Sequence, residues 1–142
     1  MPFRKKSSDA AERLASIELF EGFSPEELAR VGALVDDVDA EVGALLTEQG
    51  KPGQEAYVIV DGTADVAIGG KVVATLGAGE LVGEMSLIDN RPRSATVTAQ
   101  TPMKLLALDV KSFRTLLEEL PSANRAVMAK LTERIRANDQ NA

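Results

Sequence analysis

The sequence predicts an α+β, mainly β fold: an antiparallel eight-stranded jelly-roll β-barrel flanked by N-terminal helices and two C-terminal helices. Residues 36–109 consist of short β-branched or alternating segments separated by regular glycine turns, a pattern typical of an antiparallel sandwich or jelly roll. Residues 9–35 and 110–138 instead place apolar residues at helical spacing. A length of 142 residues suits one domain with a sizeable core, so residues 1–142 are expected to form a single domain.

The N-terminal region is predicted to contain a tail and two short amphipathic helices. Residues 1–8 are expected to be disordered, and residues 9–19 to form the first helix. Ser24 is the expected N-cap of the second helix, with Pro25 in its first helical position. Glu27 completes the capping box.

The middle region contains seven segments with strand patterns. The pair Gly69-Gly70 predicts a two-residue hairpin between two of them. We expect the glycines at 50, 53, 62 and 77 to form turns rather than to contact a ligand. The segments are VDDVDAEV, ALLTEQ, AYVIVDG, TADVAIG, KVVATLG, SATVTAQ and MKLLALD.

The C-terminal helices are predicted from a cap and a breaker. Asp109 is the expected N-cap of the helix VKSFRTLLEEL, and Pro121 ends that helix because proline has no backbone N–H to donate. A second helix with an apolar stripe is expected over residues 122–138.

The composition excludes several classes of function. The chain has no cysteine and no histidine, which removes disulfides, thiol chemistry, an imidazole base and nearly all zinc, copper or non-haem iron sites. An enzyme would have to work through carboxylates, lysine, tyrosine or a magnesium ion. We therefore expect no enzymatic activity, no resident metal and no cofactor.

The charges and the hydropathy limit the partners. A net charge of −6 argues against nucleic acid, which needs a basic face. The basic cluster Arg4-Lys5-Lys6 is expected to be a solvated tail, and Asp36, Asp37 and Asp39 to be solvated carboxylates split between two strand faces rather than a cation site. The sequence shows neither a membrane-spanning run nor a signal peptide, so a cytoplasmic protein is expected.

One stretch, GELVGEMSLIDNRPRSATVTA (79–99), is charged where its neighbours are apolar. Glu84 lies within LVGEMSLI and Arg93 within NRPRSATV, so both side chains are expected to point inward. A buried charge is costly unless something pairs with it. The alternative for Arg93 is a surface arginine paired with Asp89 or a nearby acid, and the alternative for Glu84 is a salt bridge to Arg91 or Arg93.

A phosphate would satisfy most of this stretch. Gly83 can open a short helical turn whose free N–H groups, around Met85 and Ser86, favour an anion. Arg93 adds a cation with a fork of donors, and Ser94 is small enough to allow close approach. These residues together predict a pocket for one phosphate.

Glu84 requires a ligand that carries more than a phosphate. An ionised carboxylate only accepts hydrogen bonds, so it suits a ligand with hydroxyl groups near its phosphate. A sugar phosphate or a nucleotide meets both requirements. The aliphatic residues Val73, Leu81 and Val82 are expected to line the rest of the pocket.

Two segments resemble the phosphate-binding cassette of the cyclic nucleotide-binding domain family. V-G-E-M-S-L (82–87) and P-R-S-A-T-V (92–97) are similar to the family patterns F-G-E-x-x-L and P-R-x-A-T-V. Upstream, residues 50–62 are similar to its G-x-x-G-x-x-x-Y-x-I-x-x-G pattern, and FEGFSPEELARV (20–31) looks like its entry segment. The resemblance covers about residues 18–138 and implies a short cassette helix within the barrel.

The resemblance implies a role for each matching residue. Glu84 would accept a hydrogen bond from the ribose 2′-OH, and Arg93 would hold the cyclic phosphate. Backbone N–H groups near Ser86 and Ser94 would complete the phosphate site, with Gly83 allowing close approach. The predicted ligand-binding residues are Gly83, Glu84, Met85, Ser86, Arg93, Ser94 and Ala95, with Val73, Leu81 and Val82 as apolar walls.

The sequence also departs from the family pattern. Val82 replaces the usual aromatic residue, and the last helix offers no aromatic side chain to cover the base. Arg134 and Asn138 are possible base contacts, although a solvated position on the helix is favoured for each. Ser94 resembles the serine of bacterial cyclic-AMP receptors, which favours cyclic AMP and leaves cyclic GMP open. Arg91 is expected to be a solvated neighbour of the phosphate site.

The function implied is that of a non-catalytic cyclic-nucleotide sensor whose C-terminal helices move when the ligand binds and signal to an unidentified protein effector. One alternative is an interaction module that keeps the fold and has lost the ligand. Another is a regulatory part of a larger protein that binds cyclic GMP. A metal-dependent enzyme with a similar barrel is disfavoured, because such metal sites usually use histidines and this chain has none. The oligomeric state is left open.

Overall fold

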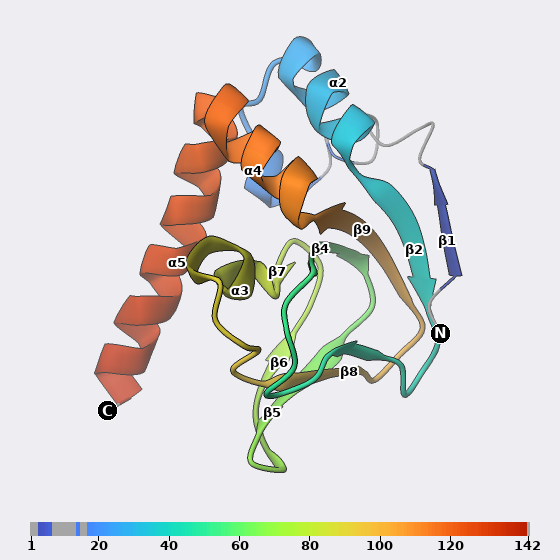
Figure 1. Cartoon of the computed structure of the whole chain (residues 1–142), viewed down its shortest axis with the longest axis vertical. Helices are drawn as coiled ribbons and strands as arrows, with labels where there is room; N and C mark the ends of the chain where they lie inside the picture. Colours follow the sequence, from blue (N-terminus) through green and yellow to red (C-terminus); the bar gives the residue numbers. More distant parts are fainter. Residues whose placement is uncertain (1–2, 7–13, 15–16, 142) are drawn as a thin grey trace.

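The computed structural model describes residues 3–6, 14 and 17–141, and the side chains of all of these except residues 3–6, 18, 89 and 134–141. The strands occupy the middle of the chain and most of the helices lie towards its ends (Figure 1). In chain order the elements are β1 (Phe3–Lys6), η1 (Glu18–Phe20), α2 (Pro25–Leu34), β2 (Asp36–Ala40), β3 (Leu45–Thr47), β4 (Glu55–Asp61), β5 (Ala64–Ile68), β6 (Lys71–Leu76), β7 (Leu81–Val82), α3 (Glu84–Asp89), β8 (Thr96–Ala99), β9 (Met103–Asp109), α4 (Val110–Glu119) and α5 (Pro121–Asn141).

The strands form two antiparallel sheets, which confirms the α+β, mainly β class, whereas the closed barrel stays a prediction. The larger sheet has the order β1-β2-β9-β4-β7, and the smaller one has the order β3-β8-β5-β6. The predicted hairpin is confirmed: Ile68 pairs with Lys71 across Gly69 and Gly70, and both glycines have a positive φ. Two positive φ angles in a two-residue loop match the twist of the adjoining strands.

Strand β9 is buried on both faces and separates two hydrophobic cores. Met103, Leu105 and Ala107 pack in the core that both sheets contribute to, whereas Leu106 and Leu108 pack against the helices. This division follows from the two-residue period of a strand. Figure 1 shows α2 and α4 at the end of the molecule away from the β5–β6 hairpin, while α5 runs from that end along one side of the molecule.

The helix boundaries follow from local chemistry. Ser24 and Glu27 form the predicted capping box, with the Ser24 hydroxyl 3.1 Å from the Glu27 backbone N–H and the Glu27 carboxylate 2.9 Å from that of Ser24. Asp109 caps α4 by accepting from the backbone N–H of Ser112 at 2.7 Å. Pro121 ends α4 and opens α5, as the missing N–H requires.

The first predicted helix, over residues 9–19, lies mostly outside the described residues. At its C-terminal end the chain forms the 3₁₀ turn η1. Leu14 and Ile17 are buried in the helical core, where the predicted apolar spacing placed them.

Residues 3–6, predicted to belong to a disordered tail, instead form strand β1 along the edge of β2. The register sets Lys5 opposite Asp37 and Lys6 opposite Asp36. An edge strand offers unpaired backbone groups, and opposite charges at paired positions favour the pairing. The basic and acidic clusters, each expected to be solvated on its own, therefore meet on adjacent strands.

Two classes of feature are absent from the part of the chain that the structure describes. Within residues 3–6, 14 and 17–141, no helix combines the length and the apolar character that a membrane span requires. The same residues contain no cluster of three or more acidic side chains arranged to hold a metal ion.

We expect Ser24→Ala to lower the free energy of unfolding by about 1 kcal/mol, because it removes the acceptor that caps α2. Ser24→Asp is the matched control, since aspartate caps a helix as well as serine does. Urea unfolding measures both. Equal stabilities for the two variants would show that the cap contributes nothing here.

Candidate functional site

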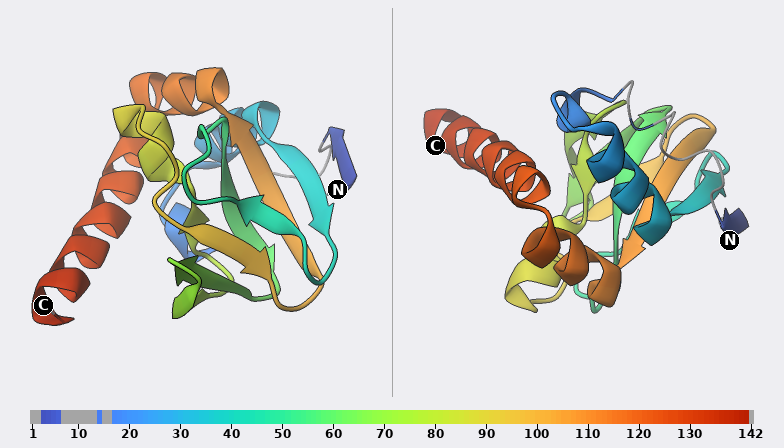
Figure 2. Two further views of the ribbon diagram at one scale, coloured as in Figure 1. Left: turned by 60° about the horizontal axis from the view of Figure 1, so that its bottom comes forward. Right: turned by 90° about the horizontal axis from the view of Figure 1, so that it is seen from above.

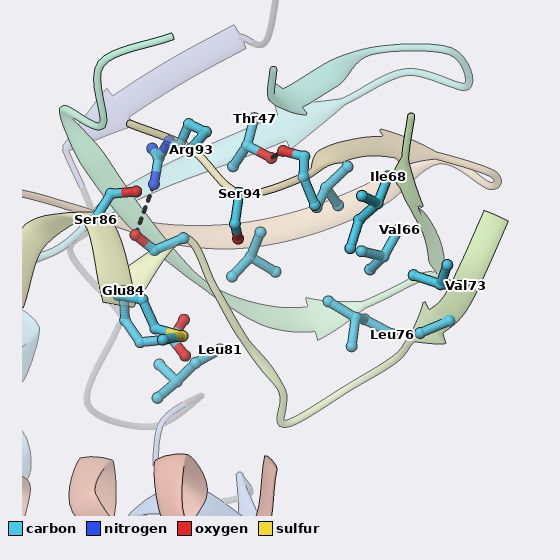
Figure 3. A pocket seen from close by; sticks show the side chains of 16 residues that line it. Thr47, Val66, Ile68, Val73, Leu76, Leu81, Glu84, Ser86, Arg93 and Ser94 are labelled. Atoms are coloured by element: carbon cyan, nitrogen blue, oxygen red, sulfur yellow. Dashed lines mark hydrogen bonds between the residues drawn. The ribbon is translucent and has the colours of Figure 1, made fainter. Parts of the chain in front are cut away.

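A cavity of about 470 Å³ lies between the β5–β6 hairpin, α3 and the segment that leads into β8. Pockets for small molecules are typically ~300–1,000 Å³, so this cavity is large enough for a nucleotide-sized ligand. Figure 3 shows from close by the side chains that line it.

The ten residues predicted to bind the ligand or to form its apolar walls all line this cavity. The structure brings together Gly83, Glu84, Met85, Ser86, Arg93, Ser94, Ala95, Val73, Leu81 and Val82. The sequence analysis missed six further residues of the wall: Thr47, Val66, Ile68, Ala74, Leu76 and Val97. The alternation of side chains along β5 and β6 could have indicated some of them, but it does not show which face of each strand is turned towards α3.

Helix α3 is the short helical turn that the sequence predicts. Its N-cap is Gly83, in the left-handed region with φ 80°, and Asn90 ends the helix with φ 59°. Glycine adopts a positive φ without the steric cost that other residues carry. A Cβ on Gly83 would also overlap Nη1 of Arg93, so this position requires glycine for two reasons.

The guanidinium of Arg93 is held against the wall of the cavity by backbone carbonyls. Its Nη1 donates to the oxygen of Gly83 at 2.6 Å and its Nη2 to the oxygen of Glu55 at 2.5 Å. Only 7% of the residue is exposed, whereas Arg91 is exposed as predicted. Two of the five N–H donors thus fix the plane of the guanidinium.

The backbone of Arg93 is held as firmly as its side chain. Its N–H donates to the carbonyl of Lys51 at 2.8 Å, and its carbonyl accepts from the N–H of Gly50 at 2.9 Å. The segment before β4 and the segment before β8 are therefore joined by two hydrogen bonds around this one residue.

Burial lowers the pKa of Arg93 below its ordinary value, and the charges of Tyr57, Glu55 and Glu84 act in the opposite direction. An arginine starts so far above neutral pH that it stays protonated in proteins. The cavity therefore contains a permanent, partly desolvated cation. Tyr57 itself is in the core, as predicted, and its hydroxyl lies 3.3 Å from a carboxylate oxygen of Glu55.

Glu84 is the first residue of α3 and is completely buried, at 0% exposure. An ionised carboxylate in the interior is stable only where charges or donors compensate for lost water. The charge of Glu84 acts on Arg93, so the two groups share one electrostatic environment at the edge of the cavity.

The wall of the cavity has a polar end and an apolar end. Figure 3 shows Arg93, Ser86 and Glu84 on one side, with Ile68 and Val73 on the opposite side. Ile68 and Val73 are 47% and 54% exposed. Exposed aliphatic side chains around a cavity indicate a surface that a partly apolar ligand can cover.

Gly53 has a role beyond the turn predicted for it. Its φ is not positive, but a Cβ there would overlap the Cβ of Ser86 and lie 3.2 Å from Nη1 of Arg93. Gly50 and Gly62 do have positive φ angles, as expected of turn residues. Gly53 is therefore required by the close approach of two segments, which the sequence alone does not indicate.

A family model supplies the identification. The model of the cyclic nucleotide-binding domain matches residues 38–120, more than half of the chain. The chain belongs to the cyclic nucleotide-binding domain family. The match includes α3, Arg93 and the strands that form the cavity.

Relatives of this cyclic nucleotide-binding domain occur in different contexts. It is 34% identical over 108 residues to a cyclic nucleotide-gated potassium channel of Mesorhizobium japonicum, covering 76% of this chain and 30% of the channel. A CRP-like cAMP-activated global transcriptional regulator of Mycobacterium tuberculosis is 25% identical over 135 residues, covering 92% of this chain and 60% of the regulator. The chain thus spans less than two thirds of either relative.

A solved structure shares the fold. The catabolite activator protein of Thermus thermophilus superimposes with a TM-score of 0.77 at 34% identity, covering 87% of this chain and 60% of that one. The similarity therefore extends well beyond the cassette motif.

The last helix of the domain, α5, contacts α4 and η1. The two further views in Figure 2 show the C-terminal part of α5 extending away from the sheets. Among the described residues, the wall of the cavity comes from strands, α3 and the segment before β8. The side chains of Arg134 and Asn138, the possible base contacts, lie outside the described part of the structure.

We expect Gly53→Ala to lower the free energy of unfolding by about 1–3 kcal/mol, because its methyl group must displace Ser86 or Arg93. Gly77→Ala is the matched control, since Gly77 also lacks a positive φ and a Cβ there meets open space. Its change should stay within about 0.5 kcal/mol. Urea denaturation that gives the same loss for both variants would contradict the close approach.

Proposed function

We propose that this domain is a non-catalytic sensor that binds a cyclic nucleotide, cyclic AMP in preference to cyclic GMP. The observation that carries the proposal is the cavity itself. It places a buried cation, Arg93, and a buried carboxylate, Glu84, beside an apolar wall. A nucleotide supplies an anion, a sugar hydroxyl and a flat ring within one small molecule, and membership of the family favours a cyclic nucleotide.

The phosphate is proposed to bind at the polar end. The cyclic phosphate carries one negative charge, and a hydrogen bond from a charged group contributes roughly 1.5–3 kcal/mol. Arg93 supplies that charge in a fixed orientation, and Ser86 and Ser94 line the same end. Together with burial of the base, this supports roughly micromolar affinity.

The ribose is proposed to bind beside Glu84. A carboxylate repels a phosphate, so its burial next to an anion site favours a ligand that also brings a hydroxyl donor. The ribose 2′-OH of a cyclic nucleotide meets that need, whereas inorganic phosphate does not.

The base is proposed to pack on the aliphatic end of the cavity. Val66, Ile68, Val73 and Leu76 offer apolar contact to a purine without polar groups that would read its edge. Preference for cyclic AMP rests on Ser94 and on the cAMP-activated regulator among the relatives. Arg134 and Asn138 remain the proposed contacts from α5 if that helix folds over the base.

The signal is proposed to pass through α3. Glu84 begins this helix at the cavity, and Leu87 of the same helix is buried in the helical core with Phe113 and Val127. A ligand that fixes α3 therefore acts on the packing of α4 and α5, and a shift of these helices is the proposed output. We propose that a protein, rather than nucleic acid, in the cytoplasm responds to it.

We expect Arg93→Ala to weaken cyclic AMP binding by about 10- to 100-fold, because it removes the charged donor to the phosphate. Arg91→Ala is the control: this arginine is exposed and should change the affinity by less than about 2-fold. Isothermal titration calorimetry measures both. Equal affinities for the two variants would contradict the assignment of Arg93.

The same titration with cyclic AMP, cyclic GMP and AMP tests the ligand class. Cyclic AMP should bind most tightly and AMP most weakly, since AMP carries an additional charge and an open phosphate that does not match the site. Binding of no cyclic nucleotide by the unmodified protein would favour the ligand-free interaction module.

We expect cyclic AMP to change the distance between α5 and the β5–β6 hairpin. The chain contains no cysteine, so a Val72→Cys, Met128→Cys pair at two exposed positions can be spin-labelled without background. The control pair Val42→Cys, Val72→Cys joins two exposed positions outside the C-terminal helices. Pulsed electron paramagnetic resonance should show a shift for the first pair only, and identical distributions with and without ligand would contradict helix movement.

A further inference from the structure

Residues 47–53, from the last residue of β3 towards β4, connect the two ends of the cavity. Thr47 lines the cavity and donates from its hydroxyl to the carbonyl of Ala95 at 2.9 Å. Gly50 and Lys51 hold the backbone of Arg93, as described above. This segment is therefore bonded along its length to the part of the chain that carries the arginine.

Gln49 extends the same segment to the opposite end of the cavity. Its backbone N–H donates to the hydroxyl of Thr96 at 3.0 Å, at the start of β8. Its side-chain oxygen accepts from the backbone N–H of Gly69 at 2.9 Å, in the turn of the β5–β6 hairpin. One residue thus bonds to both β8 and a turn that lies 20 positions further along the chain.

The hairpin tied down by this bond forms the apolar end of the cavity. Ile68 immediately precedes the turn and Val73 follows it, and both side chains face the cavity in Figure 3. β6 is an edge strand of the smaller sheet, so only β5 holds it from the side. β5 is paired with β8 over Ala64–Ala67, so only the tip of the hairpin beyond Ala67 is a two-stranded ribbon. Such a ribbon is weakly held on its own, which makes a bond at its turn effective in fixing the position of the tip.

We propose that Gln49 is a positioning residue that fixes the β5–β6 hairpin, and with it the apolar wall for the base, relative to the segment that holds Arg93. The proposal rests on the proposed function, because it assigns the base to that wall. Gln49 itself is exposed and does not line the cavity, so it acts through Gly69 rather than through a ligand contact.

The test compares Gln49→Ala with two other variants. Gln49→Glu keeps an oxygen acceptor for Gly69. Gln54→Ala removes the same type of exposed side chain from a neighbouring position that has no bond to the hairpin among the hydrogen bonds described here. All three substitutions are at the surface, and urea unfolding of each verifies that the fold is intact.

The first measurement is hydrogen exchange of the Gly69 amide by NMR, without ligand. Exchange should be faster in Gln49→Ala than in the unmodified protein, and unchanged in Gln49→Glu and Gln54→Ala. Unchanged exchange in Gln49→Ala would overturn the link between this side chain and the hairpin.

The second measurement is the ratio of affinities for cyclic AMP and for base-free ribose 3′,5′-cyclic phosphate, obtained by NMR titration. Loss of one hydrogen bond should weaken cyclic AMP by about 2- to 10-fold in Gln49→Ala and leave the base-free ligand unchanged. The added charge of Gln49→Glu acts on both anions alike, so its ratio should remain that of the unmodified protein. An unchanged ratio in Gln49→Ala, or an equal change in Gln54→Ala, would overturn the proposal.

These measurements distinguish a failure of the proposed function from a failure of the positioning role of Gln49. If the unmodified protein binds neither ligand, the proposed function is wrong, and the positioning role falls with it. If the unmodified protein binds cyclic AMP while the ratio is insensitive to Gln49, only the positioning role is wrong.

Discussion

The structure depends on the placement of one buried guanidinium. Arg93 is removed from water and held by the carbonyls of Gly83 and Glu55 at 2.6 and 2.5 Å. Burying a cation costs free energy unless its N–H donors find acceptors and its charge is compensated. Here the carbonyl oxygens of two different segments accept from the guanidinium. Several local requirements follow from it: glycine at 83 and 53, where any side chain would displace Arg93 or Ser86, and the two backbone bonds that fix the segment around residue 93.

The position of α3 joins this site to the rest of the molecule. Its first residue, Glu84, is at the cavity, while Leu87 is part of the core formed with α4 and α5. A six-residue helix has little stability of its own, because helix nucleation is unfavourable and most helical stability comes from packing. Its position is therefore set from both sides, by the cavity and by the C-terminal helices. The proposed signal from the cavity to α5 follows this packing.

The negative net charge of the chain does not describe its site, where a cation and a carboxylate lie together. A charge of −6 describes the field at a distance and disfavours extended polyanions. The cavity contains a permanent cation close to a buried carboxylate, an arrangement suited to a single small anion that also carries a hydroxyl. Membership of the cyclic nucleotide-binding domain family agrees with that chemistry. The relatives, however, are different kinds of protein: one is a channel and another is a transcriptional regulator.

The sequence by itself determined the features that depend on local chemistry. These are the capping box at Ser24, the cap at Asp109, the Gly69-Gly70 hairpin, the helix after Gly83 and the inward direction of Glu84 and Arg93. Only the tertiary structure decided the pairing of β1 with β2, the aliphatic wall from β5 and β6, the contact that requires glycine at 53, and the bond from Gln49 to Gly69. The physical reason is that propensity, capping and periodicity act over a few residues, whereas these contacts join segments brought together only when both cores are packed.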